Sequence, residues 1–313
     1  MNVLITGGAG FIGSNLSKKM VELDHNVICL DNMSLGKKEN VAELITLPNF
    51  KLIERDVNDL NLLTELMNKE KIDLVFHLAA NSDIQKSATD PTIEFRNTFS
   101  TTYNVLESMR NCGVKKMFFA STSAVYGEKS GQLLSEDVGD LKPISYYGGA
   151  KLASEAYLSS YGYMNDMDVL IFRFPNVIGP NLTHGVLFDF IDKLNKNPKE
   201  LTILGDGTQC KPYIYVADLV EAIADYSLSM DRGIQTYNLG VEGATSVRKI
   251  ADFVCEAMGL TDVKYHFTGG KIGWKGDVPR FQYDLNKIHS KGWKARYSSD
   301  EAVKATLRVV LAK

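Results

Sequence analysis

The sequence predicts an α/β fold: a doubly wound parallel sheet of the Rossmann type, with a smaller C-terminal α/β lobe. Three observations support this prediction. Short apolar strands alternate with amphipathic helical stretches through the first half of the chain. A glycine-rich turn follows the first strand and opens the first helix. After about Pro175 the alternation gives way to longer loops that are rich in glycine and proline.

The expected strands are apolar or β-branched throughout, as strands buried on both faces of a sheet must be. Strand and helix alternating in this way indicate right-handed βαβ units. The strands are expected at Val3–Thr6, Val27–Asp31, Lys51–Glu54, Leu74–Leu78, Met117–Ser121 and Val169–Phe174. The helices are expected at Phe11–Leu23, Asn58–Lys69, Thr92–Asn111, Lys151–Tyr163, Val186–Asn195, Ala217–Ser229 and Val247–Met258.

These patterns predict two domains. The first covers residues 1–175, and part of residues 210–240 is expected to return to it. Residues 176–313 are expected to form mainly a lobe that covers the carboxyl ends of the sheet, where ligands of such folds bind. A chain of 313 residues is long enough to build both.

Composition excludes several classes of function. The net charge of -3 gives no reason to expect a nucleic-acid or membrane partner. The four cysteines form no CxxC pair and the five histidines no metal-binding spacing, so we expect neither disulfides nor a metal. No signal peptide or apolar run of membrane-spanning length is evident, and a cytoplasmic location is therefore expected.

The glycine-rich turn predicts a phosphate-binding site. Gly7 permits the tight turn, Gly10 lets the backbone approach a pyrophosphate, and Gly13 lets the helix pack closely on the strand. The helix that starts at Phe11 and Ile12 then offers free N–H groups and the positive end of its dipole. This turn lies between a strand and a helix, which is the context that a dinucleotide-binding motif requires.

The second strand ends in Asp31, 24 residues after Gly7. A carboxylate at this point can bind both ribose hydroxyls of an adenosine and would repel a 2′-phosphate, so NAD is favoured over NADP. Asp56 and Val57, at the end of the third strand, suit a contact to the adenine edge. An ordinary polar strand end explains these two residues equally well.

Tyr147 and Lys151 form a candidate catalytic pair at the start of a helical stretch. Residues four apart share one helical face, so the ammonium can approach the phenol or a neighbouring ribose. A tyrosine pKa of about 10 must fall by roughly 3 units for base catalysis near neutrality, and a nearby cation in a desolvated cleft can supply this. Tyr283 and Lys287 have the same spacing, but they lie late in the chain and we interpret them as structural.

The fifth strand ends in Ser121, Thr122 and Ser123. Hydroxyl groups at the carboxyl end of a central strand lie where ligands bind in such sheets. One of them could hydrogen-bond a reacting hydroxyl group and guide its proton. A strand end capped by small polar residues is the alternative, and it is weakened by the presence of the tyrosine and lysine.

Taken together, these residues resemble the NAD-dependent epimerase/dehydratase family, the extended short-chain dehydrogenases/reductases, whose nearest well-known members are the UDP-glucose 4-epimerases. Seven blocks in order carry the resemblance over nearly the whole chain. They are TGGAGFIGSNL from Thr6, HLAAN from His77, STSAVYG from Ser121, YGGAK from Tyr147, FRFPNVIGP from Phe172, GDGTQCKPYIYVADLVEA from Gly205 and GDVPR from Gly276.

The resemblance implies a role for each matching position. Thr122 would be the active-site hydroxyl, Tyr147 the base that takes the sugar proton, and Lys151 the group that holds the nicotinamide ribose. Besides these three, the implied cofactor contacts are Gly7, Gly10, Phe11, Ile12, Gly13, Asp31, Asn32, Asp56, Val57, Leu78, Ala79, Ala80, Ser121 and Phe174. The implied substrate contacts, in addition to Tyr147, are Ser123, Asn176, Val186, Lys211 and Arg280.

The diphosphate end departs from the family pattern. Lys211 stands where many relatives have an arginine, so the charge is kept but the bidentate fork is lost. The later phosphate-binding arginine is absent, and Trp274, Lys275 or the nearby Arg280 occupies its neighbourhood. Phe281 stands at a position thought to gate the 2-substituent of the sugar, and its bulk suggests a non-acetylated hexose.

The resemblance implies an isomerase of carbohydrate metabolism that acts on a nucleotide-linked sugar, such as UDP-glucose or UDP-galactose, by transient oxidation at C4. Dehydration across C5–C6 is the first alternative, but relatives with that activity carry an acidic residue after the threonine, whereas Ser123 and Ala124 follow Thr122. Another epimerisation, a reduction, or a non-catalytic NAD sensor are the others. Relatives pair two long helices into a four-helix interface, so a homodimer is also expected.

Overall fold

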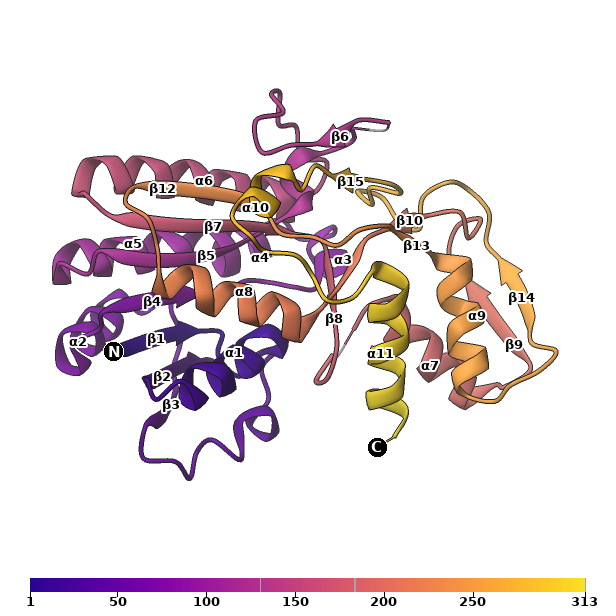
Figure 1. The fold of residues 1–313 in the computed structure, drawn as a ribbon, viewed down its shortest axis with the longest axis horizontal. Helices are drawn as coiled ribbons and strands as arrows, with labels where there is room; N and C mark the ends of the chain where they lie inside the picture. Colours follow the sequence, from indigo (N-terminus) through magenta and orange to yellow (C-terminus); the bar gives the residue numbers. More distant parts are fainter. Residues whose placement is uncertain (130, 183, 313) are drawn as a thin grey trace. The chain divides into compact units, whose positions relative to one another are not determined.

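The computed structural model describes residues 1–129, 131–182 and 184–312. The chain divides into two compact units (Figure 1). The first unit contains Met1–Val125, Ser145–Arg173 and Val220–Tyr237. The second contains the rest of the described chain, within Tyr126–Ile144, Phe174–Leu219 and Asn238–Lys313.

The described residues of the first unit build a seven-stranded sheet in the order β12-β7-β5-β4-β1-β2-β3, with parallel pairing from β3 through β5. The Rossmann-type prediction is confirmed. The strands are β1 Asn2–Thr6, β2 Asn26–Asp31, β3 Phe50–Glu54, β4 Leu74–His77, β5 Lys116–Thr122, β7 Asp168–Phe174 and β12 Ile234–Asn238. The helices are α1 Phe11–Glu22, η1 Lys38–Val41, α2 Leu60–Glu70, α3 Ile84–Ser87, α4 Thr92–Glu94, η2 Phe95–Ser100, α5 Thr101–Cys112, η3 Ser123–Tyr126, α6 Tyr146–Asn165 and α8 Val216–Leu228, of which η3 and α8 each extend into the second unit.

The strand order reverses direction between β1 and β4, and this places the site. In open α/β sheets, ligands bind outside the carboxyl ends of the strands at such a switch point. The glycine-rich turn follows β1, and the residues that follow β4 come to lie beside it. The fold therefore brings together two segments that are some 70 residues apart in the sequence.

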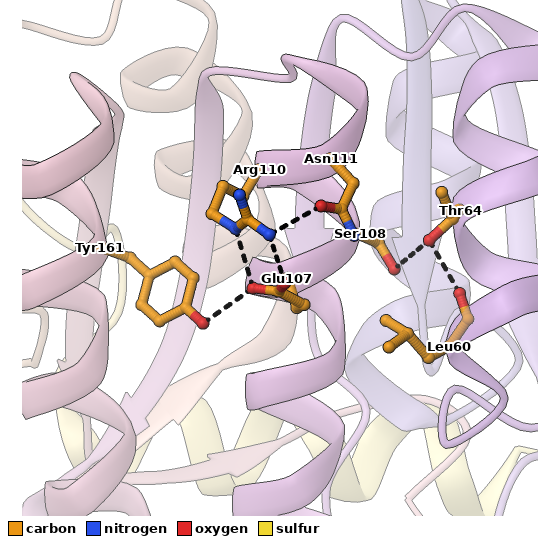
Figure 2. Close-up of polar contacts among 7 residues, drawn as sticks. All are labelled: Leu60, Thr64, Glu107, Ser108, Arg110, Asn111 and Tyr161. Carbon is orange, nitrogen blue, oxygen red and sulfur yellow. Dashed lines mark hydrogen bonds and ion pairs between the residues drawn. The ribbon is translucent and has the colours of Figure 1, made fainter.

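Helices α2, α5 and α6 pack on the same core as the sheet, and Figure 1 shows α5 and α6 side by side along it. This core includes the apolar side chains of Leu63, Val105 and Leu158. Polar contacts near the helix surfaces add to the packing (Figure 2): the Tyr161 hydroxyl donates to Glu107 over 3.0 Å, and Arg110 pairs with the same carboxylate at 2.6 Å.

The predicted helix over Thr92–Asn111 is helical in the structure but is not one regular helix. A π-helical segment, η2, separates the short α4 from α5. Hydrogen bonds in a π-helix span one residue more than in an α-helix. The direction in which successive side chains point therefore changes across Phe95–Ser100. Amphipathic periodicity alone does not reveal such a local change.

The second unit has small sheets, the pairs β10–β13, β8–β11, β9–β14 and β6–β15, and an apolar core of its own built on α7, α9 and α11. Its strands are β6 Leu133–Leu134, β8 Asn176–Ile178, β9 Glu200–Ile203, β10 Cys210–Lys211, β11 Tyr213–Tyr215, β13 Thr245–Ser246, β14 Lys264–Phe267 and β15 Gln282–Tyr283. Its helices are α7 Val186–Lys196, α9 Val247–Ala257, α10 Asn286–Ser290 and α11 Ser299–Leu311. Across the described chain, every helix is too short or too polar to cross a membrane.

Candidate functional site

Two positions of the turn after β1, Gly7 and Gly13, require glycine. Gly7 has a φ of 72°, which disfavours other residues, and a Cβ at Gly13 would lie 2.1 Å from the Gly7 carbonyl oxygen. Helix α1 begins at Phe11, and its N-cap, Gly10, supplies no side-chain cap. The first-turn N–H groups are therefore left for an external acceptor, as a pyrophosphate would be.

The Asp31 carboxylate lies beside this turn and is buried. One oxygen accepts a hydrogen bond from the Ala9 N–H at 3.0 Å and the other from the Met33 N–H at 2.9 Å. Burial raises the pKa of Asp31, and these backbone hydrogen bonds oppose the rise. The Gly10 N–H is a third backbone donor to this carboxylate, which keeps acceptor capacity for a ribose hydroxyl.

Gly36 is a part of this site that the sequence did not single out. A Cβ at Gly36 would lie 2.7 Å from both oxygens of the Asp31 carboxylate. Any other residue there would displace the carboxylate or occupy the space that a ribose needs. The signal was present as a glycine in the loop after the second strand, but its partner becomes evident only in three dimensions.

The structure brings Asn32 and Asp56 together at the ends of β2 and β3. The Asn32 amide donates to one Asp56 oxygen at 3.1 Å, and the Asn58 N–H donates to the other at 2.8 Å. Val57 is buried next to them. Together with Asp31 and the uncapped helix, these groups fit the adenosine and pyrophosphate parts of a dinucleotide.

The chain after β4 packs directly on the glycine-rich turn. A Cβ at Gly7 would lie 2.8 Å from the Ala79 nitrogen, and the Leu78 N–H donates to the Thr6 carbonyl at 3.1 Å. His77 is fully buried behind this contact, with Nδ1 2.7 Å from the Thr6 hydroxyl and Nε2 3.1 Å from the Thr102 hydroxyl. Burial and the charge of Lys151 lower the pKa of His77 to about 3, so its ring is neutral and connects two elements of the fold.

The structure brings Thr122, Tyr147 and Lys151 into one cluster. Ser145 caps α6 by accepting from the Gly148 N–H at 3.1 Å, which fixes the start of the helix that carries the tyrosine and lysine. The Tyr147 phenol lies near Thr122, the last residue of β5. The Lys151 ammonium donates to the Ala120 carbonyl at 2.7 Å on the same strand.

The electrostatics of this cluster are those of a buried site. Burial lowers the pKa of Lys151 to about 8, against the opposing effect of the Glu94 and Glu155 carboxylates. Burial and Glu94 raise the pKa of Tyr147 above its ordinary value, and the nearby Thr122 hydroxyl opposes the rise. Without a ligand, the tyrosine is therefore a neutral phenol at neutral pH.

Ser121 was expected to contact the cofactor, but in the structure its hydroxyl hydrogen-bonds to another side chain. Its hydroxyl donates to Glu155, which forms a bidentate ion pair with Arg173 at 2.6 and 3.0 Å. Both charged side chains are buried. Sequence reasoning missed this pair because the two residues lie on a helix and on the next strand, 18 positions apart.

In the second unit, Lys211 and Arg280 lie on adjacent segments, since Cys210 and Arg280 form an isolated bridge. Lys211 forms an ion pair with the buried Asp277, and Arg280 is exposed and donates to the Thr208 carbonyl at 3.0 Å. A phosphate would compete with Asp277 for the lysine, whereas the arginine guanidinium keeps further donors.

The other expected contacts occupy different elements. Asn176 is exposed at the start of β8, and Val186 is the first residue of α7. Ser123 opens the short helix η3, and Phe174 is buried at the end of β7. The second match to the tyrosine–lysine spacing is divided between β15 and α10, so it does not share a helical face.

Comparison with known proteins agrees with this arrangement. Residues 3–240 match the NAD dependent epimerase/dehydratase family. A protein of Methanocaldococcus jannaschii named "Putative UDP-glucose 4-epimerase" is 33% identical over 310 residues, with 96% of each chain covered. The Mus musculus dTDP-D-glucose 4,6-dehydratase is 30% identical over 316 residues, which cover 97% of this chain and 87% of that protein.

A solved structure gives the same result. A crystal structure of a UDP-galactose 4-epimerase superimposes with a TM-score of 0.87 at 37% identity, and covers 100% of this chain and 99% of that one. Proteins named for epimerisation and for dehydration therefore match at comparable identity. The choice between these two reactions depends on the residues of the site.

Proposed function

The chain belongs to the NAD dependent epimerase/dehydratase family, and we propose that it is a nucleotide-sugar 4-epimerase of the UDP-glucose/UDP-galactose type. The observation that carries this proposal is the arrangement of Tyr147 near Thr122, with Lys151 one helical turn further on and bonded to the Ala120 carbonyl of the same strand. It assembles a base, a guiding hydroxyl and a cation, and places no carboxylate directly after the threonine.

In the proposed reaction, the phenolate form of Tyr147 accepts the proton of the sugar 4-hydroxyl, and Thr122 orients that hydroxyl. Bound NAD would supply the hydride acceptor at C4 and return the same hydride to the opposite face of the 4-keto sugar. Lys151 stabilises the phenolate as it forms, which lowers the effective pKa of the base. Tyr147 then gives the proton back, so the enzyme ends each turnover unchanged.

Dehydration begins with the same oxidation but needs a further acid and base to expel water across C5–C6. Ser123 and Ala124, which open η3 after Thr122, cannot supply a carboxylate. This difference favours epimerisation, because proton transfer requires a group within hydrogen-bond reach of the reacting atom. A net reduction would consume reduced cofactor, and a sensor would need neither Tyr147 nor Lys151.

For the substrate, we propose that Arg280 and Lys211 bind the diphosphate, with Asn176, Val186 and Ser123 contributing to the sugar-nucleotide site. Arg280 is the stronger candidate because Lys211 is engaged by Asp277. A planar guanidinium also suits bidentate binding of phosphate oxygens. The bulk of Phe281 supports a hexose without a 2-acetamido group.

We also propose that the protein is a homodimer that pairs through η2, α5 and α6. These helices carry an aromatic cluster in which Phe99 meets Tyr157 edge-on at 5.1 Å, flanked by Phe95 and Tyr103. Phe95 is 61% exposed, and Tyr103 and Tyr157 are also exposed. An aromatic surface of this kind is typical of protein interfaces, and a second copy supplies a matching face.

The test is incubation of the purified protein with a panel of UDP-, GDP-, CDP- and TDP-sugars, followed by proton NMR. We expect a 4-epimer from UDP-glucose or UDP-galactose with no net formation of NADH. The Tyr147→Phe variant should keep its cofactor and lose turnover by orders of magnitude. A 4-keto-6-deoxy product would identify a dehydratase, and equal behaviour of the wild type and the variant would indicate a sensor.

A further inference from the structure

The end of β5 is attached to α6 by contacts from three consecutive residues. The Lys151 ammonium lies 4.6 Å from the centre of the Phe119 ring and donates to the Ala120 carbonyl at 2.7 Å. The next residue, Ser121, donates its hydroxyl proton to Glu155. Phe119 and Ser121 lie two positions apart on the strand, so their side chains leave the same face of the sheet. The contacts therefore form one line between the strand and the helix.

Glu155 continues the face of α6 that carries the candidate catalytic pair. It follows Lys151 by four residues and Tyr147 by eight, and steps of four residues keep side chains on one side of a helix. Lys151 and Glu155 are both buried, at 2% and 7% exposure. From its N-terminus onward, this side of the helix therefore carries a phenol, an ammonium and a carboxylate.

A buried ion pair holds the Glu155 carboxylate in place. Arg173, from β7, donates from Nη2 to Oε2 at 2.6 Å and from Nε to Oε1 at 3.0 Å. Oxygen Oε1 is also the atom that accepts from the Ser121 hydroxyl. A planar guanidinium that binds both oxygens fixes the plane of the carboxylate. It thereby fixes the direction in which the carboxylate accepts from Ser121.

Stability alone gives a weak reason for this ion pair. Taking two charges out of water costs about as much as their attraction returns, so an apolar pair of similar volume is often equally stable or more stable. A fully hydrogen-bonded buried network instead specifies one arrangement of the elements that it joins. The network of Glu155 joins α6, β7 and β5, and it reaches β5 at the residue between Ala120 and Thr122.

We propose that Glu155 is a positioning residue for the candidate catalytic pair on α6. Oriented by Arg173, its carboxylate holds Ser121 and so fixes the end of β5 against the helix. This sets two distances at once: that from the Ala120 carbonyl to the Lys151 ammonium, and that from the last residue of the strand to the base. Such positioning matters because a displacement of about 1 Å can cost on the order of a hundredfold in rate.

The first test needs no substrate. In the full-length protein with ¹⁵N-labelled lysine, the Lys151 ammonium signal is identified by its loss in Lys151→Met and observed at about pH 6, below the Lys151 pKa of about 8. Burial and the Ala120 acceptor should slow the exchange of its protons with water. Ser121→Ala releases the strand and leaves every charge in place. The exchange should then become roughly tenfold faster or more, because a hydrogen bond of the ammonium is weakened.

Ser108→Ala is the matched control for the exchange measurement. Ser108 is a buried serine of α5 whose hydroxyl accepts from Thr64 of α2 at 3.1 Å (Figure 2). Its loss removes a buried hydrogen bond without touching β5, so the exchange of the ammonium should stay as in the wild type. An unchanged rate in Ser121→Ala, or an equal acceleration in both serine variants, would overturn the proposal. So would a wild-type ammonium that exchanges as fast as exposed lysines.

Turnover separates positioning from stability, and this second test rests on the proposed function. The double variant Arg173→Met/Glu155→Leu replaces the ion pair by apolar side chains, which should recover much of the stability, but it offers Ser121 no acceptor. In this variant and in Ser121→Ala, kcat for UDP-glucose should fall by about tenfold to a hundredfold, while KM stays within about threefold. Ser121→Ala carries the test if the double variant does not fold.

Two outcomes of the turnover test have different meanings. If kcat of the double variant recovers together with its melting temperature, the role of Glu155 is purely structural and the proposal is overturned. If the wild type converts no sugar, the proposed function fails, whereas the exchange of the Lys151 ammonium still decides the role of Glu155.

Discussion

Replacing His77 tests whether a buried, neutral imidazole links Thr6, at the end of β1, to Thr102 of α5. In the folded protein this ring has no exposure to solvent and contacts the hydroxyls of Thr6 and Thr102. Its pKa is lowered to about 3, against 6.5 for an unperturbed histidine. In His77→Gln, a side chain that does not titrate replaces the imidazole. The part of the pH dependence of the unfolding free energy that comes from His77 should therefore disappear.

The size of the effect follows from the two pKa values. Because the folded-state pKa is depressed, the unfolded chain binds an extra proton as the pH falls below 6.5. The contribution of neutral His77 to the free energy of unfolding is present in full above pH 6.5 and is lost as the pH falls toward 3. Between pH 7.5 and 5.0 the loss integrates to about 2 kcal/mol, with a slope approaching about 1.4 kcal/mol per pH unit.

The assay is urea unfolding at half-unit intervals between pH 7.5 and 5.0, where most carboxylates remain ionised. The wild type should lose about 2 kcal/mol more than His77→Gln over this range, although the variant starts from a lower stability. His266→Gln, at an exposed histidine, should follow the wild type. Parallel curves for wild type and His77→Gln would refute the buried, neutral assignment.

Three other predictions follow from the described contacts. Asp31→Asn should weaken NAD binding about tenfold or more and reduce the preference for NAD over NADP, measured by calorimetry with both cofactors; unchanged affinities would remove Asp31 from the ribose site. Arg173→Met should cost about 3–5 kcal/mol of unfolding free energy by leaving Glu155 buried without a counter-charge, and Arg173→Met combined with Glu155→Leu should recover much of it; equal losses in the single and double variants would argue against a stabilising pair. Replacing Tyr103 and Tyr157 by aspartate should yield a monomer by light scattering at micromolar concentration, and a wild-type monomer would contradict the proposed dimer.

Six of the seven strands were predictable because each has a local signal, whereas β12 lies in a segment that was expected only to return to the first domain. Strands buried on both faces are apolar throughout, and Val27–Asp31 and Lys51–Glu54 lie within β2 and β3 as observed. The glycine-rich turn combines a strand, a helix start and four glycines in a short stretch. Tyr147 and Lys151 could be paired from sequence because they share one helix.

The rest of the site depends on contacts between distant segments. Glu94 faces Asn81 and Thr98 only because a loop and a π-helical segment meet there. The partner of Ser121 is Glu155, and that of Lys211 is Asp277, 66 residues away. Hydrophobic periodicity carries no information about such pairs, because it reports which face is buried and not which polar group lies opposite.

The most direct test of the central claim is conversion of UDP-glucose by the purified protein in D₂O, followed by NMR of the sugar product. In hydride transfer, the hydrogen on C4 would pass to the cofactor and return to C4 without exchanging with solvent. We therefore expect UDP-galactose that carries no deuterium on carbon, with the bound cofactor unchanged in redox state. A 4-keto-6-deoxy sugar, or an epimer that carries deuterium at the inverted carbon, would contradict it.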